Sequence, residues 1–326
     1  MNFTAAPYDG SSPMRPWPSL VPAAKVLRRR DGFRAGDVFE TLFFYDSLPG
    51  GGAGFTGNTG REPVLVLVHG LGDEADTWRR LIPHLSSGGY RVLALDLPGF
   101  GRSEAPGKIN LKNHTAALIT LIETLGPDTP VILIGNSMGA AVAEAAAVKK
   151  PEQIKGLVLI DGTIPGGPSN PGPVALAKLL FSTKWYRAYR GDPDGAWASL
   201  YPYYADLDAM PQEDRDFLRR RVMDRVDSLS QERAFFATQR SLIRGFISAG
   251  ALGRRIGRYK GRIILIWGEK DRIIPLSSTD AFRALRPDAK LVMVSGAGHL
   301  PQQEQPEETA RIILNFTADQ ISPDRS

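Results

Sequence analysis

The chain has 326 residues, of which 42% are hydrophobic and 23% charged, and its formal net charge at pH 7 is +5. This composition is typical of a globular protein with a sizeable core, and the length allows one large domain or a domain that carries an insertion. The chain has no cysteine, which excludes disulfides and thiolate metal sites. No segment approaches the ~18 consecutive apolar residues of a membrane-spanning helix, so we predict a cytoplasmic protein without a membrane span.

The N-terminal segment is rich in proline and polar residues. It includes Pro13, Pro16 and Pro18 and has no continuous apolar run, so it lacks the pattern of a secretory signal peptide. We predict that residues 1–22 form an arm that is poorly ordered or draped over the domain.

Arginines are clustered at residues 28–30, 219–221 and 254–255. A basic face can bind nucleic acid or an anionic surface. Because acidic residues such as Asp31 and Asp214 lie among these clusters and aromatic residues do not, we interpret the clusters as solvated surface. We therefore predict no nucleic-acid partner, and the oligomeric state is left open.

Apolar runs and helical stretches alternate along most of the chain. Strands are predicted at residues 39–45, 63–68, 90–95, 131–134, 156–160, 263–267 and 291–294, and helices at residues 77–85, 111–125 and 138–149. The strands from residue 63 onward are nearly continuous in valine, isoleucine and leucine, which is typical of a parallel sheet buried on both faces. A glycine-rich loop at residues 48–60 lacks the Lys-Ser/Thr pattern of a phosphate-binding turn. We predict an α/β fold with a doubly wound, mostly parallel sheet.

The strand–helix alternation is interrupted once. Residues 165–173 are rich in proline and glycine, as a hinge would be, and the residues after them have helical periodicity without a buried strand. We predict a helical insertion at residues 163–256, which divides the core into a first part at residues 23–162 and a second part at residues 257–326.

Aromatic residues are frequent in the predicted insertion. They are Phe181, Trp185, Tyr186, Tyr189, Trp197, Tyr201, Tyr203 and Tyr204. Such residues either form the small core of the insertion or line a pocket beneath it. We expect Trp185 and Tyr204 to contact a substrate.

A predicted strand–turn–helix places a serine at its apex. The apolar run that begins at Val131 leads into Gly135-Asn136-Ser137-Met138-Gly139, and small residues continue as a helix. Glycine two residues before and two after the serine lets strand and helix approach closely, while the strained turn pushes the hydroxyl out of the sheet. The amides after the serine begin a helix and point unpaired donors at whatever the hydroxyl attacks. Ser137 is therefore the candidate nucleophile.

A nucleophilic serine needs a base, and the base needs an orienting acid. His299, one of only four histidines, lies in a loop after the apolar strand at residues 291–294. Histidine has an unperturbed pKa near ~6.5, which suits it to accept and return a proton. Asp271 follows the strand at residues 263–267, and Asp161 ends the strand before it. Since neighbouring strand ends can both reach the imidazole, Asp271 is our first candidate for the acid and Asp161 the second.

Together with the loop His69-Gly70-Leu71-Gly72 and the turn at residues 96–103, these motifs resemble the α/β-hydrolase superfamily, in its cap-bearing branch of serine esterases and carbon–carbon-bond hydrolases. The order Ser, acid, His matches the family. The resemblance covers most of residues 60–162 and 257–320 and implies a helical cap over the carboxyl ends of the strands.

The resemblance also implies roles for single residues. The backbone N–H groups of Leu71 and Met138 would form the oxyanion hole, and His69 would support that loop without taking a proton from the serine. We predict that the side chains of Leu71, Met138 and Leu300 contact the substrate.

These observations predict a serine hydrolase that cleaves a carboxylic ester of a small or medium apolar substrate through an acyl-enzyme, with neither metal nor organic cofactor. A carbon–carbon-bond hydrolase, an acyltransferase or a cofactor-free haloperoxidase-type enzyme would use the same triad. A ligand-binding or accessory protein of this fold with negligible turnover is the alternative from another class. The run after His299 and the loop after His69 lack the signatures of the carbon–carbon hydrolases, which favours ester hydrolysis.

Overall fold

The computed structural model describes residues 3–32, 34, 37–47, 62–104, 107–162, 186–247 and 249–321. Of residues 245–247, 249–252 and 320–321 it describes the backbone alone. The predicted glycine-rich loop at residues 48–60 and the predicted hinge at residues 165–173 lie outside the described residues, as do Phe181 and Trp185.

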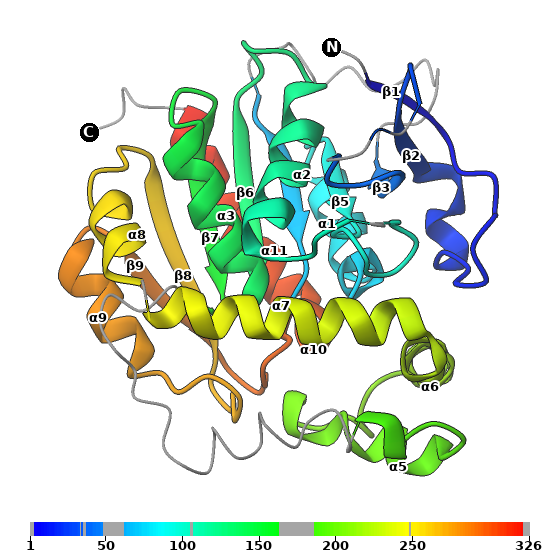
Figure 1. The fold of residues 1–326 in the computed structure, drawn as a ribbon. Helices are drawn as coiled ribbons and strands as arrows, with labels where there is room; N and C mark the ends of the chain where they lie inside the picture. The colour runs from blue at the N-terminus through cyan, green and yellow to red at the C-terminus, as the bar shows by residue number, and fades with distance from the viewer. Residues whose placement is uncertain are drawn as a thin grey trace.

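Within the described residues, a nine-stranded sheet has the order β1-β2-β3-β5-β4-β6-β7-β8-β9 (Figure 1). Its strands are β1 (Phe3–Pro7), β2 (Ala24–Arg29), β3 (Leu42–Asp46), β4 (Val64–Val68), β5 (Val92–Leu95), β6 (Val131–Asn136), β7 (Ile154–Ile160), β8 (Arg262–Gly268) and β9 (Lys290–Val294). Neighbouring strands from β5 to β9 run parallel, whereas β1, β2, β3 and β5 pair antiparallel in turn. Every residue of β4, β5 and β6 is buried, which explains their continuous apolar runs. The predicted mostly parallel sheet is confirmed.

Helices cover both faces of the sheet. α2 (Leu111–Glu123) and α3 (Met138–Lys149) share one hydrophobic core with one face, and α1 (Leu81–Ser87) and α11 (Pro306–Ile321) share a second core with the other. The other helical segments outside the insertion are η1 (Pro18–Ala23), η2 (Ala75–Trp78), α9 (Ser278–Leu285) and α10 (Pro301–Glu304). The two separate cores confirm that the sheet is doubly wound.

The N-terminal segment belongs to the sheet, which the sequence did not indicate. β1 pairs with β2 as the edge strand, and Met14 and Leu20 are buried. Four of the five residues of β1 are exposed, so this edge strand lacks the apolar pattern by which a strand is recognised. The described part of the predicted arm thus includes the edge strand β1, and Met14 and Leu20 anchor it on the domain, whereas its predicted boundary at residue 22 stays a prediction.

The helical segments that the structure describes between β7 and β8 are α5 (Pro193–Ala198), η3 (Tyr201–Tyr203), α6 (Gln212–Asp227), α7 (Leu229–Ile247) and α8 (Ala249–Ile256). In Figure 1, α7 crosses the end of the core where α3 begins, and α5 and α6 lie beyond it. Both α7 and α8 also pack on the core that contains α2 and α3, where Ala234 of α7 and Ile256 of α8 are buried. Among the described helices, none combines the length and the apolar character needed to cross a membrane.

Candidate active site

Ser137 lies at a sharp turn between β6 and α3. Its backbone has φ 55° and ψ −119°, a conformation that is costly for a residue other than glycine and that clusters at functional sites. The flanking glycines allow the close approach. A Cβ on Gly139 would lie 2.0 Å from the carbonyl oxygen of Val68, and a Cβ on Gly135 would lie 2.4 Å from the carbonyl oxygen of Gly139. The structure therefore contains the predicted strand–turn–helix, with Ser137 at its apex.

His299 is hydrogen bonded to Asp271. Nδ1 of the imidazole is 2.9 Å from Oδ2 of Asp271, and the two side chains are only 3% and 1% exposed. The other oxygen, Oδ1, accepts hydrogen bonds from the amides of Ile273 and Ile274 at 2.7 and 3.2 Å. Burial acts to raise the pKa of Asp271, but the hydrogen bond and charge of His299 and the two amides lower it below its ordinary value. An ionised Asp271 makes Nδ1 the donor and leaves Nε2 to accept a proton.

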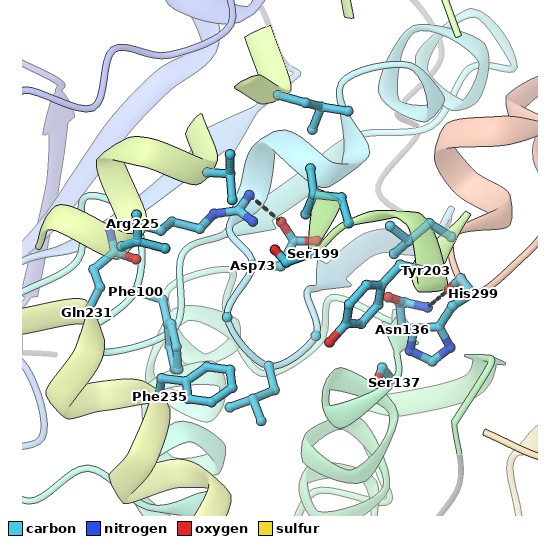
Figure 2. A pocket seen from close by; sticks show the side chains of 18 of the residues that line it. Asp73, Phe100, Asn136, Ser137, Ser199, Tyr203, Arg225, Gln231, Phe235 and His299 are labelled. Carbon is cyan, nitrogen blue, oxygen red and sulfur yellow. Dashed lines mark hydrogen bonds and ion pairs between the residues drawn. The ribbon is translucent and has the colours of Figure 1, made fainter. Parts of the chain in front are cut away.

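The loop that carries His299 is held from both sides. The His299 amide donates to the carbonyl oxygen of Tyr203 in the insertion at 2.8 Å, and Nδ2 of Asn136 donates to the carbonyl oxygen of His299 at 3.1 Å (Figure 2). Glu304 accepts from the amide of Gly298 at 2.7 Å and from that of Ala205 at 2.6 Å. The position of the imidazole thus depends on the insertion as well as on the sheet.

Asp161 is the second acid near His299. It is fully buried at the end of β7, and its Oδ1 accepts from the amide of Gly268 at 2.8 Å. One oxygen each of Asp161 and Asp271 and a ring nitrogen of His299 lie within 4.8 Å of one another. A metal ion could use this spacing, but Nδ1 of His299 is already hydrogen bonded to Asp271. Among the described residues, no hydrogen bond joins Asp161 to His299, so Asp271 is the acid that is hydrogen bonded to the imidazole.

Burial raises the pKa of Asp161 well above its ordinary value of 3.8, and the negative charge of Asp271 raises it further. The folded state therefore keeps a proton that the unfolded chain loses as the pH rises above that value. Asp161 by itself should therefore destabilise the fold as the pH rises over this range, whereas carboxylates with lowered pKa values, such as Glu74 and Asp46, act in the opposite direction. Asp161→Asn removes the titrating group and should raise the melting temperature at pH 7, with a gain that vanishes near pH ~4. Thermal unfolding of both proteins across this pH range tests the prediction, and a difference in melting temperature between the variant and the wild type that does not grow from pH ~4 to pH 7 would contradict it.

Two backbone amides near Ser137, those of Leu71 and Met138, have no hydrogen-bond partner among the described residues. Met138 is the first residue of α3, so the helix offers no acceptor for its N–H group. The N–H group of Leu71 has no hydrogen-bond partner within the described residues. A Cβ on Gly70 would lie only 3.2 Å from Cβ of Ser137, so the loop that carries Leu71 passes directly beside the serine.

His69 holds this loop against the sheet. Its Nδ1 donates to the carbonyl oxygen of Gly70 at 2.7 Å, and its Nε2 accepts from the amide of Leu97 at 2.9 Å. The side chain is fully buried, and burial lowers its pKa. A neutral imidazole with both nitrogens occupied matches the supporting role that the resemblance implies.

Ser137 and His299 open into one chamber of about 1030 Å³ (Figure 2). Most of its lining side chains are apolar or aromatic. The lining residues are Gly70, Leu71, Gly72, Asp73, Phe100, Asn136, Ser137, Tyr186, Tyr189, Ser199, Leu200, Tyr203, Tyr204, Leu218, Val222, Arg225, Val226, Gln231, Phe235, Gln239, His299, Leu300 and Gln303. The core and the insertion both contribute, so the chamber lies between them.

The structure brings most of the predicted substrate-contact residues to this chamber. Leu71, Tyr204 and Leu300 line it, whereas Trp185 lies outside the described residues. The prediction for the side chain of Met138 is wrong. This side chain does not line the chamber but is 4% exposed in the core shared with α2 and α3, because the first turn of α3 packs directly on the sheet.

Several lining residues were missed by the sequence analysis. Phe100 lies in the turn that we treated as a family motif, and Phe235 lies on α7. Asp73 and Arg225 form an ion pair between elements 152 residues apart. No sequence pattern predicts a pairing over such a separation. The only local signal was the position of Asp73, two residues after Leu71 in the predicted oxyanion loop.

Comparison with known proteins agrees with this geometry. Residues 65–312 match the sequence model of the alpha/beta hydrolase family. Lipase 1 of Psychrobacter immobilis is 27% identical over 267 residues, which cover 78% of this chain and 76% of the lipase. A 2-hydroxy-6-oxononadienedioate/2-hydroxy-6-oxononatrienedioate hydrolase of Burkholderia vietnamiensis is 31% identical over 267 residues, which cover 79% of this chain and 88% of that enzyme.

Solved structures of this fold superpose well. The 2-hydroxy-6-oxo-6-phenylhexa-2,4-dienoate hydrolase of Rhodococcus sp. strain RHA1 has a TM-score of 0.69 against this chain at 24% identity. The match covers 85% of this chain and 95% of that one. At this identity the likeness concerns the fold alone. With the family match over most of its length and a relative above 30% identity, the chain belongs to the α/β-hydrolase family.

Proposed function

We propose that this hydrolase cleaves carboxylic esters of small or medium apolar substrates, with Ser137 as nucleophile, His299 as base and Asp271 as orienting acid. One observation carries the proposal: Ser137 and His299 face a largely apolar chamber, while Asp271 is hydrogen bonded to the imidazole from behind. The helical insertion would act as the cap that closes this chamber.

The proposed reaction has two steps. Neutral His299 takes the hydroxyl proton of Ser137 at Nε2, and the serine oxygen attacks the acyl carbon. The amides of Leu71 and Met138 would donate to the oxyanion. The leaving alcohol takes the proton from His299, and an acyl-enzyme remains. A water molecule, deprotonated by the same imidazole, then releases the acid and restores Ser137, so the cycle needs no metal or organic cofactor.

A carbon–carbon-bond hydrolase is the second candidate. The observation that favours it is the relative from Burkholderia vietnamiensis, at 31% identity, whose name specifies a 2-hydroxy-6-oxo dioate as substrate. The same triad could serve such a reaction. A panel of p-nitrophenyl esters of increasing acyl length, with one vinylogous β-diketone acid beside it, separates the candidates. Faster turnover of the diketone than of every ester would overturn the ester proposal.

The lining aromatics should set the preferred acyl length. Each methylene buried in an apolar chamber contributes ~0.8 kcal/mol, or about fourfold in kcat/KM. Phe235→Ala and Tyr204→Ala enlarge the chamber and should shift the optimum of the ester panel to longer chains. Tyr201 is a matched control, because it neighbours the chamber in sequence but is 41% exposed and outside the lining. An optimum that moves as much in Tyr201→Ala as in the other two variants would contradict a role of the chamber in selection.

A further inference from the structure

An ion pair between Asp73 and Arg225 faces the chamber (Figure 2). Asp73 lies in the loop after β4, and Arg225 lies on α6 of the insertion. Nη2 of Arg225 is 3.0 Å from Oδ1 of Asp73, and the two side chains are 15% and 14% exposed. Because both side chains line the same chamber as Ser137, a substrate that extends from Ser137 toward Arg225 would meet the pair.

Arg225 has a second carboxylate partner. Its Nε and Nη2 donate to the two oxygens of Glu74 at 2.8 and 2.9 Å. Burial acts to raise the pKa of Glu74, but the charges of Arg225 and Arg221 lower it to about 2, so Glu74 is ionised. The single positive charge of Arg225 is thus shared between the two carboxylates of Asp73 and Glu74. No further positive charge of this side chain remains for the carboxylate of a substrate.

The ion pairs continue away from the chamber. Glu74 contacts Arg221, which contacts Asp76 at 3.2 Å. Arg102 contacts Asp76 at 2.8 Å and Asp96 at 2.7 Å. This chain of ion pairs, from Asp73 to Asp96, contains the four carboxylates Asp73, Glu74, Asp76 and Asp96 and the three guanidiniums Arg102, Arg221 and Arg225. With all four carboxylates ionised, this chain of ion pairs carries one excess negative charge.

Among the described residues, the rest of the chamber lining offers no positive charge that compensates this excess. Of its lining residues in the described part of the chain, Arg225 is the only lysine or arginine. Burial already raises the pKa of Asp73, although the charge of Arg225 acts to lower it. A substrate carboxylate would place another negative charge beside Asp73 in surroundings of low dielectric constant. The ionised form of Asp73 is already disfavoured there, so the added repulsion opposes binding of the substrate.

We propose that Asp73 is a specificity-determining residue that limits the chamber to uncharged substrates and excludes those with a carboxylate on the group that extends toward Arg225. The proposal rests on the proposed ester hydrolysis and narrows its substrate class. A neutral hydrogen-bonding group, such as a second ester carbonyl, brings no charge and is accepted.

The first test uses the wild type. The p-nitrophenyl monoesters of succinate, glutarate and adipate are compared with their methyl esters, which differ by one methyl group and one charge. After division by the rates of alkaline hydrolysis, kcat/KM for the methyl ester should exceed that for the free acid by at least about tenfold for the chain that reaches the ion pair. Equal values across all three lengths would overturn the proposal.

The second test changes the charge. Asp73→Asn keeps the size of the side chain and an acceptor for Arg225 but removes one negative charge, so the ratio of methyl ester to free acid should fall about tenfold. The ratio is insensitive to any general loss of activity. Asp224→Asn is the matched control, because Asp224 contacts Arg221 at 3.4 Å but is 42% exposed and does not line the chamber. A ratio unchanged in Asp73→Asn, or lowered equally in both variants, would overturn the role of Asp73.

A binding measurement is independent of turnover. Calorimetry on the Ser137→Ala variant compares dimethyl adipate with monomethyl adipate, neither of which this variant would hydrolyse. Tighter binding of the dimethyl ester by at least about tenfold supports charge exclusion even where ester turnover fails, in which case the proposed function alone is lost. Equal binding of the two compounds would contradict the inference whatever the reaction is.

Discussion

Replacing Ser137 by alanine is expected to lower kcat for ester hydrolysis by about 10⁴-fold or more. The reason is that a single hydroxyl, at the apex of the turn between β6 and α3, would carry the covalent step. The side chain of Ser137 is only half-buried and faces the chamber, and alanine removes no more than its hydroxyl, so the fold should be intact. Steady-state kinetics on the best substrate of the p-nitrophenyl panel, with thermal unfolding as the control for folding, provides the measurement. Residual turnover above about a tenth of the wild type would end the interpretation as a serine hydrolase.

Asp271→Asn is expected to lower kcat by ~10³–10⁴-fold. An amide at this position no longer fixes Nδ1 of His299 as the donor and no longer stabilises the imidazolium that forms when Ser137 loses its proton. In the wild type, the hydrogen bond of 2.9 Å to His299 helps to lower the pKa of Asp271 and so keeps this carboxylate ionised. Asparagine cannot supply that negative charge.

The matched control is Asp161→Asn. Asp161 is buried beside the same imidazole but is hydrogen bonded to the amide of Gly268, not to His299, so its replacement should cost less than about tenfold in kcat. The reverse ranking of the two variants would make Asp161 the orienting acid and would move this role from the end of β8 to the end of β7.

The sequence predicted those parts of the site whose causes are local. The turn at Ser137 needs only an apolar run, two glycines and a helix of small residues, and these stand next to one another in the chain. The predicted helix at residues 138–149 has the bounds of α3. His299 and Asp271 each follow an apolar strand, and the parallel arrangement of those strands brings their carboxyl ends to one edge.

Other features depend on contacts that no local pattern encodes. β1 is recognisable only through its pairing with β2, because its own residues are exposed. The orientation of Met138 follows from how α3 packs on the sheet, whereas the sequence indicated only its place after the serine. Asp73 and Arg225 meet because the insertion folds back over the loop after β4. No local sequence pattern predicts where the insertion contacts the rest of the domain.

Mass spectrometry after reaction with a fluorophosphonate tests most directly whether Ser137 is an activated nucleophile. The probe phosphonylates a serine whose proton is taken by a neighbouring base, and the reaction does not depend on knowing the natural substrate. We predict a single adduct on the peptide that contains Ser137, no adduct in Ser137→Ala and much slower labelling in Asp271→Asn. A folded wild type that stays unlabelled, or that is labelled at another serine, would contradict the proposed site.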